Sequence, residues 1–178
     1  MKNLFDKAFS LLIIIFFSWL YIIVGLVVLY NIGFPIFFKA KRVGKNNKVF
    51  EIYKFRTMNA NTHIATNKSM QFLRKTNLDE FPQFFNVLLG QMSVVGPRPH
   101  DLDEDILFES KIDNYNIRKS VKPGITGLSA IKGNRGGTEI SFIKERVAYD
   151  LEYIKKQNFI YDVKIILKTI KTIFYPNH

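Results

Sequence analysis

A run of 23 residues without a charge, residues 8–30, constrains the fold of this chain more than any other feature. At about 1.5 Å per helical residue, the run is long enough to cross a hydrocarbon layer of roughly 30 Å. It is too long for the apolar region of a typical signal peptide, and no small-residue cleavage site follows it. The run therefore predicts a retained membrane segment, in preference to the buried core helix of a soluble domain.

The charges on either side of this segment indicate its orientation. After it, one window of ten residues, 39–48, holds five cations and no acid: Lys39, Lys41, Arg42, Lys45 and Lys48. The positive-inside rule places that side in the cytoplasm. The N-terminal flank also leans positive, because Lys2 and Lys7 outweigh Asp6. Two cytoplasmic flanks favour a re-entrant segment that bends near Ser18 over a helix that spans the membrane.

Composition narrows the choice of partner. The formal net charge of +11 favours a polyanion: nucleic acid, an anionic membrane or a phosphorylated substrate. The membrane segment decides for inner-membrane lipid and phosphorylated substrates, so no nucleic acid is expected. The chain has no cysteine, which excludes disulfides and thiolate metal sites, and its three histidines lack the spacing of a zinc site.

The rest of the chain predicts an α+β fold that is mostly helical. Aromatic runs at 36–38 and 49–55 flank a Gly/Asn turn, which predicts a small β-hairpin. Residues 59–70 are polar and predict a surface excursion. Residues 121–137 mix five glycines with cations, a pattern that favours a basic surface loop over a phosphate-binding loop.

Two amphipathic helices follow, one capped by Thr138 and one from about Phe159. The basic face of the second suits a membrane interface and ordinary solvent equally well. With no repeat and no linker, the chain divides only into a membrane-embedded helix (1–33) and a cytoplasmic catalytic domain (34–178).

The run from Leu78 to Pro99 carries the chemistry. The adjacent carboxylates Asp79 and Glu80 precede an apolar stretch of helical spacing, and Arg98 follows within Gly-Pro-Arg-Pro. Asn77 imitates the start of a capping box, which places both acids in or just before a first helical turn, whose dipole favours their charged forms. A carboxylate that attacks or holds a metal, with a cation for phosphate oxygens, suits phosphoryl transfer. The alternative is an ordinary capped helix that ends in a turn.

Four motifs in order place this chain close to a known family: KRVGKNNKVFEIYKFRTM, LDEFPQFFNVLLGQMSVVGPRPH, KPGITG and YDLEYIKK. Together they resemble the bacterial polyprenyl-phosphate sugar-1-phosphate transferases, the monotopic phosphoglycosyl transferases. The likeness runs from the membrane segment to about Ile170. It implies transfer of a phosphosugar from a UDP-sugar to undecaprenyl phosphate at the cytoplasmic face of the bacterial inner membrane, with Mg²⁺ as cofactor and UMP as product.

The resemblance also implies roles for single residues. The family's catalytic pair falls on Asp79, the expected nucleophile and metal ligand, and on Glu80. Its phosphate-binding arginines fall on Arg98 and Arg74, and the aspartate of its last motif on Asp150. Further cations are weaker candidates for substrate binding: Lys54, Arg56, Lys122 and Arg135.

Two departures from the family pattern bear on these expectations. Family members commonly carry Ser-Pro in the membrane helix, where this chain has Ser18-Trp19. The stretch 126–133 lacks the tryptophan and glutamine that the family often has, which affects the expected substrate contacts. Residues 135–138 resemble a variant of the branch that handles hexose phosphates such as glucose or galactose.

Two other functions stay open at this point. A membrane-anchored phosphatase would use Asp79 with water as the acceptor. A non-enzymatic adaptor would use the basic face to recruit anionic partners, and would tolerate loss of both carboxylates. The sequence leaves open the sugar, the glycan pathway and the oligomeric state, a homodimer included.

Overall fold

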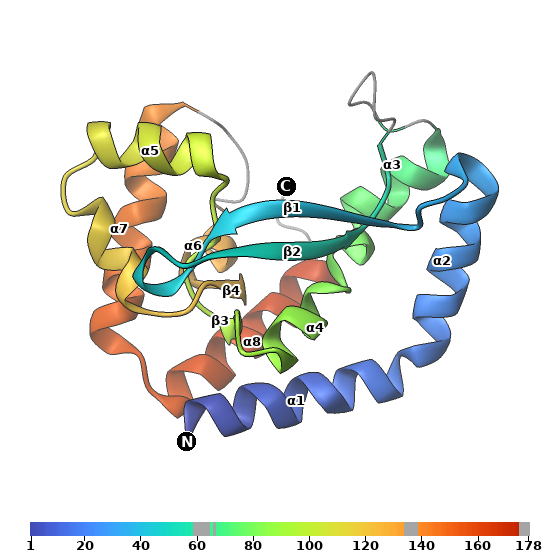
Figure 1. Cartoon of the computed structure of the whole chain (residues 1–178). Coiled ribbons are helices and arrows are strands. Elements are labelled where there is room, and N and C mark those ends of the chain that lie inside the picture. Colours follow the sequence, from blue (N-terminus) through green and yellow to red (C-terminus); the bar gives the residue numbers. More distant parts are fainter. Residues whose placement is uncertain (59–64, 66, 134–138, 175–178) are drawn as a thin grey trace.

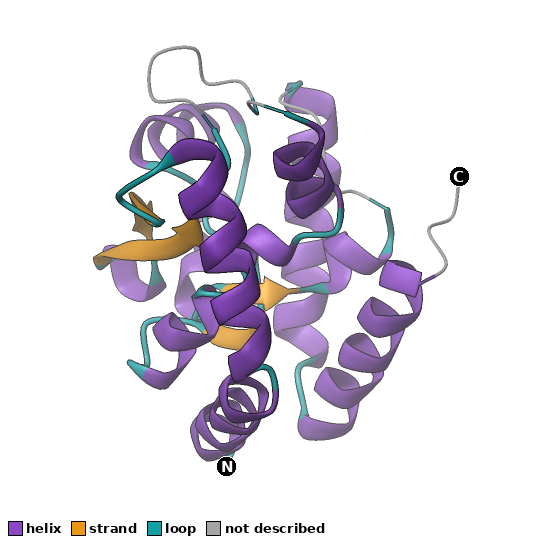
Figure 2. Cartoon of the chain, turned by 90° about the vertical axis from the view of Figure 1, so that its right-hand side faces the viewer, coloured by secondary structure: helices purple, strands orange, loops and turns teal. Residues whose placement is uncertain are grey.

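The structure is a computed structural model that describes residues 1–58, 65, 67–133 and 139–174. Helices make up most of it, and strands are confined to two small areas (Figures 1 and 2), which confirms the prediction of a mostly helical chain with a small hairpin. The elements are α1 (Lys2–Phe16), α2 (Ser18–Ile32), β1 (Phe37–Val43), η1 (Lys45–Asn47), β2 (Val49–Phe55), α3 (Lys68–Lys75), η2 (Leu78–Glu80), α4 (Gln83–Leu88), β3 (Ser93–Val95), α5 (Leu102–Lys111), η3 (Tyr115–Ser120), β4 (Gly124–Thr126), α6 (Leu128–Ile131), α7 (Ile140–Lys156) and α8 (Phe159–Phe174).

The apolar N-terminal stretch forms two helices, α1 and α2, with a bend of 64° between them. Phe17 separates the two and leaves the helical region, with φ −100° and ψ 18°. The break therefore lies beside Ser18, where a bend was predicted. Within the described residues, no helix alone has the length and hydropathy to cross a membrane, although this bent pair passes when taken together.

Both N-terminal helices pack against the rest of the chain. Val24 and Val28 of α2 share a buried cluster with Phe55 of β2 and with Met70 and Leu73 of α3. Helix α1 lies along α4 and β3 at the lower edge of Figure 1. Residues 1–33 thus share a core with the part that follows them.

The predicted hairpin is confirmed: β2 has the bounds of the predicted run 49–55, and β1 extends beyond the predicted run 36–38 to Val43. β1 and β2 pair antiparallel over seven residues each, from Phe37 opposite Phe55 to Val43 opposite Val49. Asn46 and Asn47 in the turn have positive φ, a conformation that asparagine tolerates better than most residues. Phe50 and Ile52 of β2 enter the largest core cluster.

A second sheet was not predicted. β3 pairs in parallel with β4, with Ser93 opposite Gly124 and Val95 opposite Thr126. The prediction of a basic surface loop over 121–137 is therefore wrong for β4 and for α6, whose residues are largely buried. Strands of three residues are too short to produce a readable alternation of apolar and polar side chains.

Three predicted boundaries also change. Asn77 has a left-handed φ of 57° and makes no side-chain cap, so the capping box is wrong: the dyad lies on the short η2, and α4 starts only at Gln83. The predicted excursion over 59–70 is wrong for residues 68–70, which begin α3; positions 59–64 and 66 lie outside the described residues. Helix α7 begins after Glu139. Thr138, its predicted cap, lies outside the described residues.

Candidate active site

The adjacent carboxylates Asp79 and Glu80 occupy a single 3₁₀ turn, η2, between α3 and α4. Pro82 follows and fixes the start of α4. Asp79 is buried, with 6 % of its surface exposed, whereas Glu80 keeps partial access to solvent. The short turn thus places two neighbouring acids in different surroundings.

Burial, together with the neighbouring charge of Glu80, raises the pKa of Asp79 from its usual 3.8 to about 6. Lys54 and Arg74 act in the opposite sense but do not outweigh burial. The expectation that a helix dipole would favour the charged form is therefore wrong for Asp79. A turn of three residues aligns too few peptide groups to offset the loss of water.

Glu80 behaves differently because cations face it. Burial raises its pKa, but Lys54 and Arg98 more than compensate, and the net pKa lies below the usual value. The Lys54 Nζ atom donates to Glu80 Oε1 over 2.7 Å, and Arg98 Nη2 lies 3.7 Å from the same oxygen. The pKa values of the two carboxyl groups therefore shift in opposite directions, which is typical of sites that use two acids for separate roles.

A polar cavity of about 220 Å³ opens beside Glu80. Four of the described cations line it, from β1, β2, the loop after β3 and α7: Arg42, Lys54, Arg98 and Arg146. Gln83, His100, Asp101 and Glu104 add further polar groups. A cavity with this excess of positive charge suits a ligand that carries phosphate groups.

The loop that carries Arg98 is fixed by its backbone. The Gly96 amide donates to the Thr126 carbonyl, and the Gly124 amide donates to the Pro97 carbonyl. The two chains lie so close that a Cβ on Gly96 would collide with the Lys122 carbonyl oxygen. Glycine is required here by the approach of one backbone to another.

Arg118 supports the same loop from inside the protein. Its guanidinium donates to the Arg98 carbonyl over 2.7 Å and to Asp150 Oδ2 over 2.8 Å. Asp150 was predicted to bind substrate, but only 1 % of its surface is exposed. The structure therefore assigns Asp150 to holding Arg118, and through it the Arg98 loop.

His100 belongs to this buried group. Arg118 Nη1 lies 2.9 Å from His100 Nδ1, and since a guanidinium can only donate, Nδ1 accepts and Nε2 carries the proton. Burial, with the nearby Arg118 and Arg146, holds the pKa of the ring far below its usual range. His100 thus lines the cavity as a neutral side chain.

The structure separates the other predicted cations. Arg56 donates to the carbonyls of Ile32 and Gly33 and so caps the end of α2. Lys122 donates to Asn3 of α1 and is not among the described residues that line the cavity. Arg74 is exposed but influences Asp79 electrostatically. Arg135 lies outside the described residues.

Sequence reasoning missed several residues of the cavity. Arg146 lies four residues before Asp150 on α7, among the buried Ile143 and Val147. A basic and an acidic residue at that spacing on an apolar helix face is a readable signal. Arg42 and His100 lie within the recognised motifs, but their position gave no indication of which neighbours they would meet.

The donor set bears on the expected magnesium ion. Within the described ranges, no three or more histidine, aspartate or glutamate side chains are grouped so that they could hold a metal ion. Mg²⁺ is commonly held by one or two carboxylates together with substrate phosphates, and only then completes its shell with water. Glu80 lines a cavity suited to phosphate and Asp79 precedes it on the same turn, so this pair of carboxylates fits this mode of binding.

The break between α1 and α2 lies next to the dyad. The Tyr21 hydroxyl donates to the carbonyl of Phe81, the residue after Glu80, over 2.9 Å. The Phe17 ring meets the Phe81 ring edge to face, with 5.7 Å between centroids. The bent N-terminal pair therefore contacts the residue that immediately follows the two carboxylates.

Comparison with known proteins identifies this arrangement. The sequence model of the family described as "Bacterial sugar transferase" matches residues 1–176. The chain belongs to the bacterial sugar transferase family. It is 40% identical over 95% of its length to a UDP-glucose:undecaprenyl-phosphate glucose-1-phosphate transferase of Klebsiella pneumoniae, and 36% identical over 96% to the protein of that name in Escherichia coli strain K12.

Relatives of this family differ in length. The chain spans 39% of each of these two relatives. It spans 93% of the "Exopolysaccharide production protein PSS" of Rhizobium leguminosarum, to which it is 34% identical over 96% of its own length. A part equivalent to this chain is therefore nearly the whole of one family member and a minor part of others.

Proposed function

We propose that this chain transfers a sugar-1-phosphate from a UDP-sugar to undecaprenyl phosphate and releases UMP, as a membrane step in the assembly of a bacterial glycan. The observation that carries the proposal is the divergent pair on η2. One buried carboxylate, Asp79, has a pKa near 6, and its neighbour Glu80 is held ionised by Lys54 and Arg98 beside a cationic cavity. Family membership and the names of the relatives support the same reaction.

In the first step, an oxygen of Asp79 attacks the phosphorus that bears the sugar. A bond forms between this oxygen and phosphorus, and the bond from phosphorus to the bridging oxygen breaks. UMP leaves with the electron pair, and the phosphosugar stays on the carboxylate. A carboxylate with a raised pKa is a stronger nucleophile than an ordinary aspartate, which supports Asp79 in this role.

In the second step, an oxygen of undecaprenyl phosphate attacks the same phosphorus, and Asp79 leaves as a free carboxylate. Glu80 carries its charge throughout, so that its main task is to hold Lys54 and Arg98 toward the reacting phosphates. Splitting the transfer in two replaces one difficult displacement with two easier ones. Asp79 and Glu80 would hold Mg²⁺ together with the substrate phosphates, where the ion would neutralise charge on the diphosphate.

We further propose that α1 and α2 form a re-entrant segment at the cytoplasmic face of the bacterial inner membrane. Lys2, near the start of α1, pairs with Asp162 of α8 over 2.6 Å, which holds that end beside the catalytic part. Helices α1 and α2 also expose large apolar side chains that would contact lipid: Leu4, Leu11, Leu12, Ile15, Phe16, Trp19, Ile22, Ile23 and Leu26. The same face would bring the dyad close to a lipid-borne acceptor.

The proposal is tested with purified protein, a panel of UDP-sugars that begins with UDP-glucose, Mg²⁺ and undecaprenyl phosphate. UMP release that depends on the lipid acceptor is expected. With UDP-sugar alone and rapid quenching, mass spectrometry should find a sugar-phosphate adduct on a peptide that contains Asp79. Asp79→Asn should abolish both signals, whereas Asp113→Asn, at an exposed site, should retain them.

Three results would contradict the proposal. Equal UMP release with and without the lipid would indicate a phosphatase that uses water. Substantial turnover by Asp79→Asn would place the nucleophile elsewhere. If folded protein released no UMP from any of the sugar nucleotides, the proposed transferase function would be refuted.

A further inference from the structure

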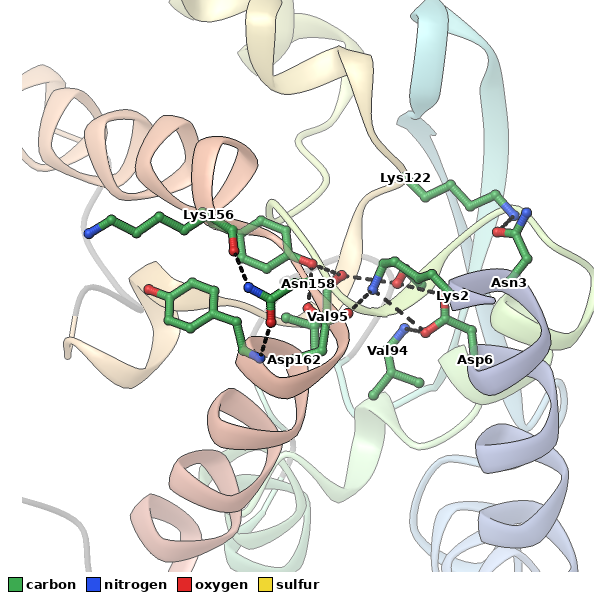
Figure 3. Close-up of polar contacts among 12 residues, drawn as sticks. Lys2, Asn3, Asp6, Val94, Val95, Lys122, Lys156, Asn158 and Asp162 are labelled. Carbon is green, nitrogen blue, oxygen red and sulfur yellow. Dashed lines mark hydrogen bonds and ion pairs between the residues drawn. The ribbon is translucent and has the colours of Figure 1, made fainter.

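The first turns of α1 bury polar groups in a helix that is otherwise strongly apolar. Asp6 is 3 % exposed and Ser10 is fully buried, although many of their neighbours on α1 face outward. Burying a carboxylate costs free energy unless hydrogen bonds compensate for the lost water. Asp6 therefore has partners that a plain membrane anchor would not need, and Figure 3 shows them.

Both oxygens of Asp6 engage β3. The Val94 amide donates to Oδ1 over 3.2 Å, and the Ser93 hydroxyl lies 2.8 Å from Oδ2. The same hydroxyl lies 2.9 Å from the Val95 carbonyl, so Asp6 and this carbonyl share its single proton. One side chain of the N-terminal helix thus contacts two of the three residues of β3.

A second buried carboxylate completes the connection. Asp162 of α8 is 2 % exposed and accepts from Lys2 of α1 over 2.6 Å. The Tyr153 hydroxyl of α7 lies 2.7 Å from Asp162 and 3.1 Å from the Val95 carbonyl. β3 is therefore contacted directly by Asp6 of α1 and by Tyr153 of α7, and Asp162 of α8 contacts both Tyr153 and Lys2. Figure 3 shows Asp6, Val94, Val95 and Asp162 in this group.

β3 leads directly into the loop that carries Arg98. Only Gly96 and Pro97 separate Val95 from Arg98, and Gly96 is packed against the backbone at Lys122 and Gly124. Such packing leaves the loop no slack to absorb a shift of the strand. A displacement of β3 by loss of its Asp6 contacts would therefore reach Arg98 and its position beside Glu80.

We propose that Asp6 is a positioning residue for the reaction, which acts through β3 to hold Arg98 toward the phosphates of the substrate. The inference rests on the proposed transferase function. It gives the N-terminal helix a part in the geometry of the site, in addition to its contact with the membrane. Asp6 itself touches no substrate in this scheme, because its contacts are with β3 and it is not among the described residues that line the cavity.

Single substitutions provide the first test. Asp6→Ala leaves the Val94 amide without its partner, and we expect kcat for UMP release to fall about tenfold or more. Asp6→Asn should recover most of this loss, because its amide oxygen still accepts from Val94 and its NH₂ group can donate to Ser93. Asp113→Ala serves as the control and should match the native protein. If Asp6→Ala does not fold, Ser93→Ala, which removes one hydroxyl only, takes its place.

A double-mutant cycle separates positioning from general stability. In a background of Arg98→Lys, the effect of Asp6→Ala should shrink to about twofold or less, since the group that it positions is already impaired. Losses that simply multiply in the double variant would overturn the proposal. Full kcat in folded Asp6→Ala would overturn it equally.

Amide hydrogen exchange gives a readout that does not need turnover. Residues 93–98 should exchange faster in Asp6→Ala than in the native protein, while β1 and β2 should be unchanged. Unchanged exchange in 93–98 would contradict the proposal even in an active enzyme. A further outcome separates the two proposals. If the native protein releases no UMP, but residues 93–98 still exchange faster in Asp6→Ala, the transferase function is refuted and the mechanical link between Asp6 and β3 remains.

Discussion

Asp79 and Glu80 are neighbours in the chain, yet the pKa of Asp79 is raised and the pKa of Glu80 is lowered, because only Glu80 has cations at close range. Lys54 and Arg98 lie within 4 Å of a Glu80 oxygen. For Asp79, burial affects the pKa more than Lys54 and Arg74 do. At pH 7, a carboxyl group with a pKa of about 6 is about nine-tenths ionised. Asp79 can therefore be both basic and charged at neutral pH.

The pH dependence of the reaction should report this carboxyl group. We expect kcat/KM for UMP release to rise with pH and to level off above a pKa of about 6, since only the ionised Asp79 attacks. Arg74→Gln removes a cation that lowers the pKa of Asp79, so the midpoint should move to higher pH. Lys75→Gln, a matched change at the next exposed residue, should leave it in place. A profile without an inflection between pH 5 and about 7.5 would argue against Asp79 as the nucleophile.

The same pKa shift predicts a gain in stability when the charge is removed. A carboxyl group whose folded pKa is raised favours folding below its unfolded pKa, and this contribution is lost as pH rises through about 6. Asp79→Asn should therefore raise the free energy of unfolding at pH 8 by about 1–3 kcal/mol. Thermal melting should show the difference shrinking as pH falls to about 4. A lower melting temperature for Asp79→Asn at pH 8 would contradict this account.

For the site, the sequence located the residues but not their separate tasks. Asp79, Glu80, Lys54 and Arg98 were predicted and do lie together. Arg56 was predicted with them but caps α2, because a cation in a sequence carries no sign of which oxygen it will meet. The burial that raises the pKa of Asp79 depends on contacts far along the chain and had no local signal.

At the scale of elements, the break between α1 and α2 is also a contact with the dyad turn. Tyr21 donates to the Phe81 carbonyl, and the rings of Phe17, Tyr21 and Phe85 surround this segment. A helix break usually follows from a proline or a similar local cause. Here the break at Phe17 coincides with aromatic packing on Phe81, without proline in either helix.

Tyr21→Phe tests whether this contact supports the reaction. The change keeps the ring and removes one hydrogen bond, worth about 0.5–1.5 kcal/mol, so we expect kcat to fall about two- to tenfold. Tyr30→Phe on the same helix is the control, because Tyr30 is 90% exposed. UMP release measures both variants, with circular dichroism to establish folding. Equal kcat in both variants would restrict the Tyr21 contact to packing.

The elements that the sequence predicted well were those with a clear period. The hairpin and α8 follow alternating or helical spacing over at least seven residues each. β3 and β4 span three residues, and α4 starts after a left-handed Asn77 that resembles a helix cap in sequence. Pairing between residues 31 positions apart decides β3 and β4, and no local window contains both partners.

At the scale of the whole molecule, both ends of the N-terminal helix pair contact the part of the chain that follows it. Lys2 pairs with α8, and the carbonyls of Ile32 and Gly33 accept from Arg56. An arrangement of this kind suits a segment that enters one side of a bilayer and leaves by the same side. A spanning helix would have to break the contact of Lys2 with α8 and the contacts of Asp6 with β3.

Cysteine labelling in intact bacterial cells tests this topology. The chain has no cysteine, so Asn3→Cys provides a single reactive site, and Asn47→Cys in the hairpin turn marks the catalytic side. Both sites should react with a membrane-impermeant maleimide only after the inner membrane is permeabilised. Labelling of Asn3→Cys alone in intact cells would show that the N-terminal end is periplasmic and that the segment spans.

The pairing of Lys2 with Asp162 also sets an order of events during synthesis. These residues lie 160 positions apart, and a ribosome adds about 5–20 residues per second, so Lys2 is made about 8–30 s before its partner. Ser93, the partner of Asp6, comes 87 positions after it. In a chain that inserts as proposed, the apolar helices therefore meet the bilayer before their protein partners exist. On this proposal, the catalytic part would fold onto helices that the membrane has already positioned.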